Sequence, residues 1–175
     1  MRWLLLAILA YACLVLQAWA FSPGGLAAQV HGHWTAPDLA LLFGLFIALY
    51  FEPPVVFVTG WCLGMASDIL PVSGKIGVLA LLFCLLLYGV SLLRAVIPRG
   101  RVWVQFGLAL GIVLVVHGVW YVATRLLEGS DPMVLRSAEE ALLDAGYSAV
   151  LAPYLFWLLG WLRAPLGIPS GTSSD

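Results

Sequence analysis

The stretch GMASDILPVSGKIG, residues 64–77, places a carboxylate, a turn and closely spaced small residues between two long apolar runs. Its most informative residue is Asp68, at the edge of the first run. An ionised side chain at the centre of a bilayer costs roughly 2.5 to 3.5 kcal/mol on insertion scales, and less near the interface. A carboxylate in this position therefore needs either hydrogen-bonding partners or a function.

The composition around Asp68 is that of an integral membrane protein. Hydrophobic residues make up 63% of the chain, charged residues only 10%, and the mean hydropathy is +1.04. The 175 residues have room for about six spans of the ~20 residues that a crossing needs. The formal net charge of −1 and the lack of a dense Lys/Arg cluster argue against a nucleic-acid partner.

We expect an all-α integral membrane protein, a compact bundle that forms a single transmembrane domain over residues 1–165. An amphipathic helix is expected on the outer interface at about 133–145, with an ordinary solvated connector as the alternative. Residues 166–175 are expected to form a short disordered cytoplasmic tail. The six expected transmembrane helices lie at about 3–21, 37–51, 54–70, 76–97, 102–124 and 147–163.

Two of these assignments have alternatives. The first apolar run also resembles a secretory signal with cleavage after Ala20, although the run is long for a signal and further spans follow it. The uncharged runs 39–51 and 53–67 are short for full spans and could form a re-entrant hairpin. We expect two short crossings with a sharp stop at Pro53-Pro54. The pair enters and leaves on one side in either case, so the orientation of later segments is unaffected.

The distribution of basic residues sets the expected orientation, because cytoplasmic loops carry an excess of Lys and Arg. With six spans and the N-terminus inside, five of the eight basic residues are cytoplasmic and both termini face the cytoplasm. The cytoplasmic set is Arg2, Arg94, Arg99, Arg101 and Arg163, and the outer set is Lys75, Arg125 and Arg136.

The surroundings of Asp68 suggest how it is accommodated. Gly60, Gly64 and Asp68 share one helical face, so a neighbouring helix could approach the backbone closely beside the carboxylate. The carboxylate could then accept hydrogen bonds from the turn at Pro71 to Gly74, or from the N-terminus of the next helix, which begins near Gly77. Lys75 is a candidate ion-pair partner. In this interpretation Asp68 holds together the hairpin of the expected helices 54–70 and 76–97. The alternative is that Asp68 contacts a ligand, an ion or a partner.

Other polar residues inside the apolar runs are few. His117 and Gln17 are candidate interior polar residues, and Pro153 should kink the last helix. There is no phosphate-binding glycine loop, nucleophile elbow or zinc-spaced His/Glu pair, and His31 and His33 alone are a weak metal signal. We therefore expect a protein that is not an enzyme and that has neither a cofactor nor a metal site.

The motif around Asp68 resembles that of the rod shape-determining protein MreD family. The family pattern is similar to G-L-L-x-D-L-L followed by a Gly/Pro turn and P-L-G, and this chain has GMASDIL at 64–70, then Pro71, Ser73-Gly74 and Gly77. The Pro37-Asp38-Leu39 opening and the stretch 147–163 are also similar, so the resemblance covers most of the chain. Lys75 and the long acidic loop 125–146 depart from the family pattern.

The resemblance implies a nonenzymatic scaffold subunit of the cell-wall elongation complex in the bacterial inner membrane. It implies MreC as the direct partner and, more distantly, RodA, its transpeptidase and MreB, with membrane lipid around the bundle. We expect the partner helix on the apolar faces of the first three spans and the outer amphipathic helix. The family fold is similar to the substrate-binding subunits of energy-coupling-factor transporters, so the alternative function is a small-molecule, vitamin-like binding subunit.

Overall fold

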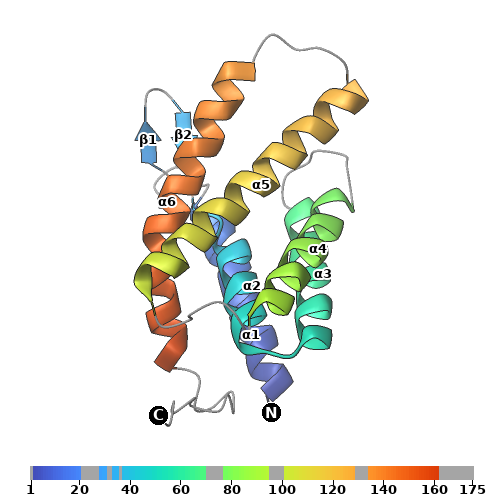
Figure 1. Cartoon of the computed structure of the whole chain (residues 1–175), viewed down its shortest axis with the longest axis vertical. Coiled ribbons are helices and arrows are strands. Elements are labelled where there is room, and N and C mark those ends of the chain that lie inside the picture. Colours follow the sequence, from blue (N-terminus) through green and yellow to red (C-terminus); the bar gives the residue numbers. More distant parts are fainter. Residues whose placement is uncertain are drawn as a thin grey trace.

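The computed structural model describes residues 2–20, 28–30, 33–35, 37–69, 77–94, 101–128 and 134–161. This part of the chain forms six helices and one short β-hairpin (Figure 1). In chain order the elements are α1 (Arg2–Ala20), β1 (Ala28–Val30), β2 (His33–Thr35), α2 (Leu39–Tyr50), α3 (Pro53–Ile69), α4 (Val78–Leu93), α5 (Val102–Glu128) and α6 (Val134–Trp161).

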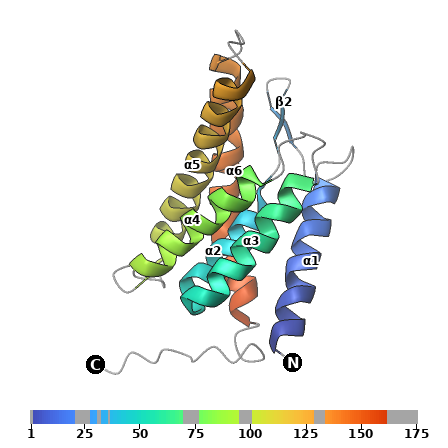
Figure 2. The same cartoon turned by 90° about the vertical axis from the view of Figure 1, so that its right-hand side faces the viewer.

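Consecutive helices run in opposite directions, so the start of α1 and the end of α6 lie at the same end of the bundle (Figures 1 and 2). The α5–α6 hairpin extends past the other helices at the opposite end (Figure 2). Its 27 and 28 residues correspond to about 40 Å each. The β-hairpin contacts α6 at this end.

Helix α2 is the core of the molecule. Every residue from Leu39 to Leu49 is buried, and contacts with α1, α3, α4, α5 and α6 cover it on all sides. Phe46 packs its ring against Phe156 of α6, with ring centroids 5.9 Å apart. At 12 residues, α2 is about 18 Å long, well short of the ~30 Å hydrocarbon thickness.

The helices around α2 expose large apolar side chains on their outer sides. A water-soluble protein would cover most of this surface with polar residues, so the pattern fits helices surrounded by lipid. Within the described residues, Val102–Val122 and Ala141–Trp161 are long and apolar enough to cross a membrane, while Trp3–Trp19, Leu39–Tyr50 and Val78–Leu93 are shorter apolar helices. The exposed side chains include Trp3, Tyr11 and Trp19 on α1, Phe57 and Trp61 on α3, Leu81 and Leu85 on α4, Trp103 and Val115 on α5, and Tyr154 and Trp157 on α6.

One expectation from the sequence is corrected. The separate outer helix at 133–145 and the last span at 147–163 are one continuous helix, α6, which also passes through Pro153 without ending. No strong helix breaker separates the polar part from the apolar part, since only Gly146 lies between them. The expected all-α class describes the bundle, and the one addition that the sequence did not predict is the antiparallel hairpin of β1 and β2, with Gln29 opposite Trp34. Residues 166–175 lie outside the described residues.

Candidate functional site

The Asp68 carboxylate is bonded to the N-terminus of α4. Its Oδ2 accepts hydrogen bonds from the Gly77 amide at 2.8 Å and the Ala80 amide at 3.2 Å, and its Oδ1 accepts one from the Leu79 amide at 3.2 Å. These amides belong to the first turn of a helix, where intrahelical acceptors are lacking and the helix dipole favours negative charge. The hydrogen bonds expected from the next helix are therefore present, and they satisfy a carboxylate that is only 2% exposed.

The glycines that precede Asp68 let α3 and α4 approach each other closely. A Cβ atom on Gly64 would clash with the Cα of Ala80 and would lie 2.8 Å from the carbonyl oxygen of Leu79. A Cβ on Gly60 would lie 3.3 Å from the carbonyl oxygen of Phe83. The expected small-residue face is thus present, and α4 occupies it.

The turn between these helices is described only at its end. Gly77 has a φ of +105°, in the left-handed region that glycine adopts without a Cβ penalty, and it directly precedes α4. Pro71, Gly74 and Lys75, which the sequence also singled out, lie outside the described residues. Of the two hydrogen-bonding partners expected for Asp68, the observed one is the helix N-terminus.

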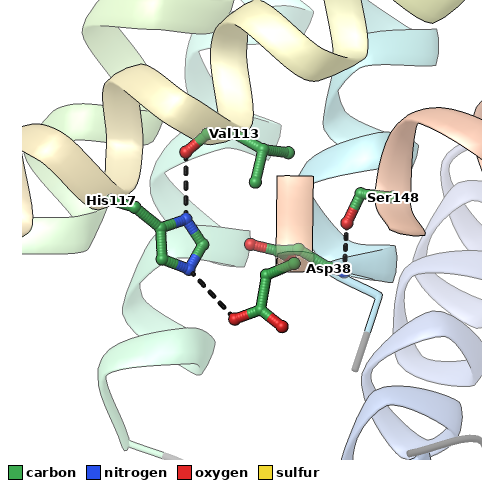
Figure 3. A network of polar contacts seen from close by, with 5 residues as sticks. Asp38, Val113, His117 and Ser148 are labelled. Atoms are coloured by element: carbon green, nitrogen blue, oxygen red, sulfur yellow. Dashed lines mark hydrogen bonds and ion pairs between the residues drawn. The ribbon is translucent and has the colours of Figure 1, made fainter. Parts of the chain in front are cut away.

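A second polar junction lies at the N-terminus of α2. The Gln17 side chain of α1 accepts a hydrogen bond from the Ala40 amide at 2.7 Å, and Asp38 caps the helix by accepting one from the Leu41 amide at 3.0 Å. The Asp38 amide in turn donates to the Ser148 hydroxyl of α6 at 3.0 Å (Figure 3). Three parts of the chain far apart in sequence are therefore joined at one helix end.

His117 on α5 lies close to this junction. Its Nδ1 is 2.9 Å from the Val113 carbonyl oxygen, one turn earlier on the same helix (Figure 3). Its Nε2 is 3.6 Å from Oδ2 of Asp144 on α6. Asp144 precedes Ser148 by four residues, so both side chains lie on one face of α6. Electrostatic interactions also link Asp38 with His117 and Asp144.

Sequence reasoning found part of this junction. Gln17 and His117 were singled out as interior polar residues, whereas Asp38, Asp144 and Ser148 were not. For Asp38 the signal was present, because Asp before an apolar helical run is a common N-cap. For Asp144 it was hidden, because the residue was assigned to an outer loop that is in fact part of α6. Pro153, the third candidate, lies within α6 and is half-buried.

A third polar contact lies at the C-terminal end of α2, opposite the Asp38 junction. The Arg94 guanidinium, directly after α4, donates a hydrogen bond to the Phe51 carbonyl oxygen at the end of α2.

In the described part of the chain, no group of three or more His, Cys, Asp or Glu residues is arranged to hold a metal ion. At both the Asp68 and the α2 junctions, polar side chains bind the backbone amides of a neighbouring helix start.

Comparison with known proteins identifies the family. The family model for the rod shape-determining protein MreD matches residues 1–161, which include all the described helices. No curated protein and no solved structure matches the chain. Since the match covers nearly the whole sequence, the chain belongs to the MreD family, membrane proteins with a role in rod shape determination.

Proposed function

We propose that the chain is a six-pass scaffold subunit of the bacterial inner membrane, with both termini in the cytoplasm, that binds the transmembrane helix of MreC. In this proposal RodA, its transpeptidase and MreB are reached through the assembled complex. The family's role in rod shape determination supports a scaffold. Further support comes from the polar contacts between helices and from the exposed glycines on α5.

The interior supports a rigid scaffold. The carboxylate of Asp68 bonds to three backbone amides, and Gln17, Asp38 and Ser148 bond around the start of α2. A vitamin-binding subunit needs several polar groups that converge on an enclosed ligand. Here these polar groups serve contacts between helices, which favours a scaffold over a carrier.

The observation that carries the proposal is the outer face of α5. Gly107, Gly111 and Gly118 are exposed, and a Cβ added to any of them would meet nothing within 4 Å. Their spacing of four and seven residues places them on one side of the helix. Glycines spaced by four residues let transmembrane helices approach until their backbones nearly touch. A partner helix therefore has room to pack closely here.

The other helices are less suited to this contact. The α2 helix, one of those expected from the sequence to hold the partner, is buried on all sides. The outer face of α1 carries Trp3, Tyr11 and Trp19, whose bulk would hold a second helix farther away. The glycine face of α3 is already occupied by α4. We therefore place the MreC helix on α5.

The experiment compares MreC recovery with two variants of the full-length tagged chain, purified from native membranes in mild detergent. Gly107→Leu combined with Gly111→Leu should reduce MreC recovery about tenfold or more, which corresponds to a loss of at least ~1.4 kcal/mol. Gly89→Leu is the matched control, because Gly89 on α4 is also open and should leave MreC bound.

Unchanged MreC recovery with the α5 variant would reject this docking face. Absence of MreC from the wild-type preparation, together with an ATPase pair and a coupling membrane subunit, would instead support the carrier. Mass spectrometry of the co-purified proteins distinguishes the two results.

A further inference from the structure

The hydrogen bond and the ion-pair contact of His117 favour a proton between its ring and Asp144. A backbone carbonyl can only accept, so Nδ1, 2.9 Å from the Val113 oxygen, must carry a hydrogen. A neutral ring then has a lone pair on Nε2, and that lone pair faces the Asp144 carboxylate at 3.6 Å. Two acceptors cannot bond to each other. The contact is favourable when Nε2 carries a proton, because a positively charged ring then faces the carboxylate.

The pair lies where the α5–α6 hairpin meets the rest of the molecule. Helices α5 and α6 pack mainly on each other, as α3 and α4 do, and the contacts between the hairpin and the α1–α4 unit are fewer. One of the polar contacts across this boundary is the hydrogen bond from the Asp38 amide to the Ser148 hydroxyl. Ser148 lies one turn after Asp144 on α6, so a shift of the α6 backbone at Asp144 carries Ser148 with it.

We propose that the α5–α6 hairpin is a moving part controlled by one proton, held against the start of α2 while His117 and Asp144 share that proton. When the proton leaves to water, the Nε2 lone pair and the carboxylate repel each other, Asp144 moves away, and Ser148 separates from the Asp38 amide. This motion would change the orientation of α5. It goes beyond the scaffold role proposed above and does not depend on the identity of the partner.

The surroundings of His117 and Asp144 are compatible with gain and loss of this proton. The charged groups that act on His117 in the described part of the chain are Asp144 on α6 and Asp38 before α2, both acidic. His117 is the sixth residue from the end of the apolar segment Val102–Val122, and Asp144 is the fourth residue of Ala141–Trp161. The pair therefore lies near the ends of both segments, where protons from the interface can reach it. Gln17 and Ser148, which also form hydrogen bonds at this junction, do not titrate.

The test measures distances between spin labels on the full-length chain in lipid nanodiscs. One label is placed on the native Cys62, which is exposed on α3, and the other on Val150→Cys, which is exposed on α6. The substitutions Cys13→Ala and Cys84→Ser remove the other two thiols. Between about pH 5 and about pH 9, which bracket the ordinary titration of histidine, this distance should change by about 2 Å or more. The pair Cys62 and Leu85→Cys, within the α3–α4 unit, should not change.

Two variants identify the groups responsible. Asp144→Asn has an amide that can donate to Nε2 and does not titrate, so it should keep the low-pH distance at both pH values. Ser148→Ala removes the bond to Asp38 and should move the distance toward its high-pH value at low pH. The proposal is overturned if the wild-type distance is the same at both pH values, or if the Asp144→Asn variant responds to pH as the wild type does. The wild-type comparison decides even where a variant does not fold.

Discussion

Asp68 combines a buried charge with three backbone donors, and its replacement should therefore act on stability first. Asp68→Ala leaves these amides without an acceptor, and each orphaned buried group costs about 1–3 kcal/mol, so we expect a loss of about 3 kcal/mol or more. Asp68→Asn keeps one carbonyl oxygen but loses the charge, and about 1–2 kcal/mol is expected. Unfolding in a denaturing detergent series measures both.

The exposed Glu52→Gln provides the control, because it removes a carboxylate that lies outside the core. The opposite result is informative as well. If Asp68→Asn unfolds like the wild type yet no longer recovers MreC, Asp68 takes part in a contact with a ligand or partner, and its bonds to α4 are secondary.

Individual residues differ in how far the sequence predicts their contacts. Asp68 and its partner Ala80 are only 12 residues apart, so helical spacing and the dipole of the next helix sufficed to anticipate their hydrogen bond. Asp38 and Ser148 are 110 residues apart. No local sequence pattern predicts their hydrogen bond, which depends on α6 packing beside the start of α2.

The pairing of α3 and α4 depends on the absence of a side chain at position 64. Gly64→Ala makes a methyl group clash with the Cα of Ala80, and because the contact is with backbone, the helices must separate. We expect a loss of about 1–3 kcal/mol, the usual cost of overpacking, and partial loss of the bonds to Asp68. Gly89→Ala, which meets nothing within 4 Å, should be neutral or slightly stabilising. Equal stability of the two variants would contradict the observed packing.

At the level of whole elements, the hydropathy pattern predicted two helices where the backbone forms the single helix α6. The run from Val134 to Trp161 changes from polar to apolar, so a hydropathy pattern separates an outer helix from a span. Backbone hydrogen bonding does not depend on that change, and α5 packs against α6, the two helices crossing at an angle in Figure 1. The β-hairpin was missed for another reason, since its strands are only three residues each and lie in a polar segment.

For the whole molecule, the sequence predicted the class but not the arrangement. A high apolar content and spaced charged loops sufficed to predict helices in a membrane, and the family match is consistent with this. They could not predict which helix forms the core. Helix α2 is apolar on every side, as a lipid-facing helix also can be, and only its contacts with five other helices distinguish the two.

The short, central α2 makes the proposed six crossings testable. The turn after it, at Glu52, should reach the cytoplasm together with the start of α5, because Arg94 bonds to the Phe51 carbonyl and basic residues favour that side. In a background without native cysteines, Glu52→Cys and Val102→Cys should react with an impermeant maleimide only after the cells are permeabilised. Leu142→Cys, exposed near the projecting end of the α5–α6 hairpin, should react in intact spheroplasts. Labelling of Glu52→Cys from outside would reverse the orientation, and no labelling from either side would make α2 and α3 a re-entrant pair.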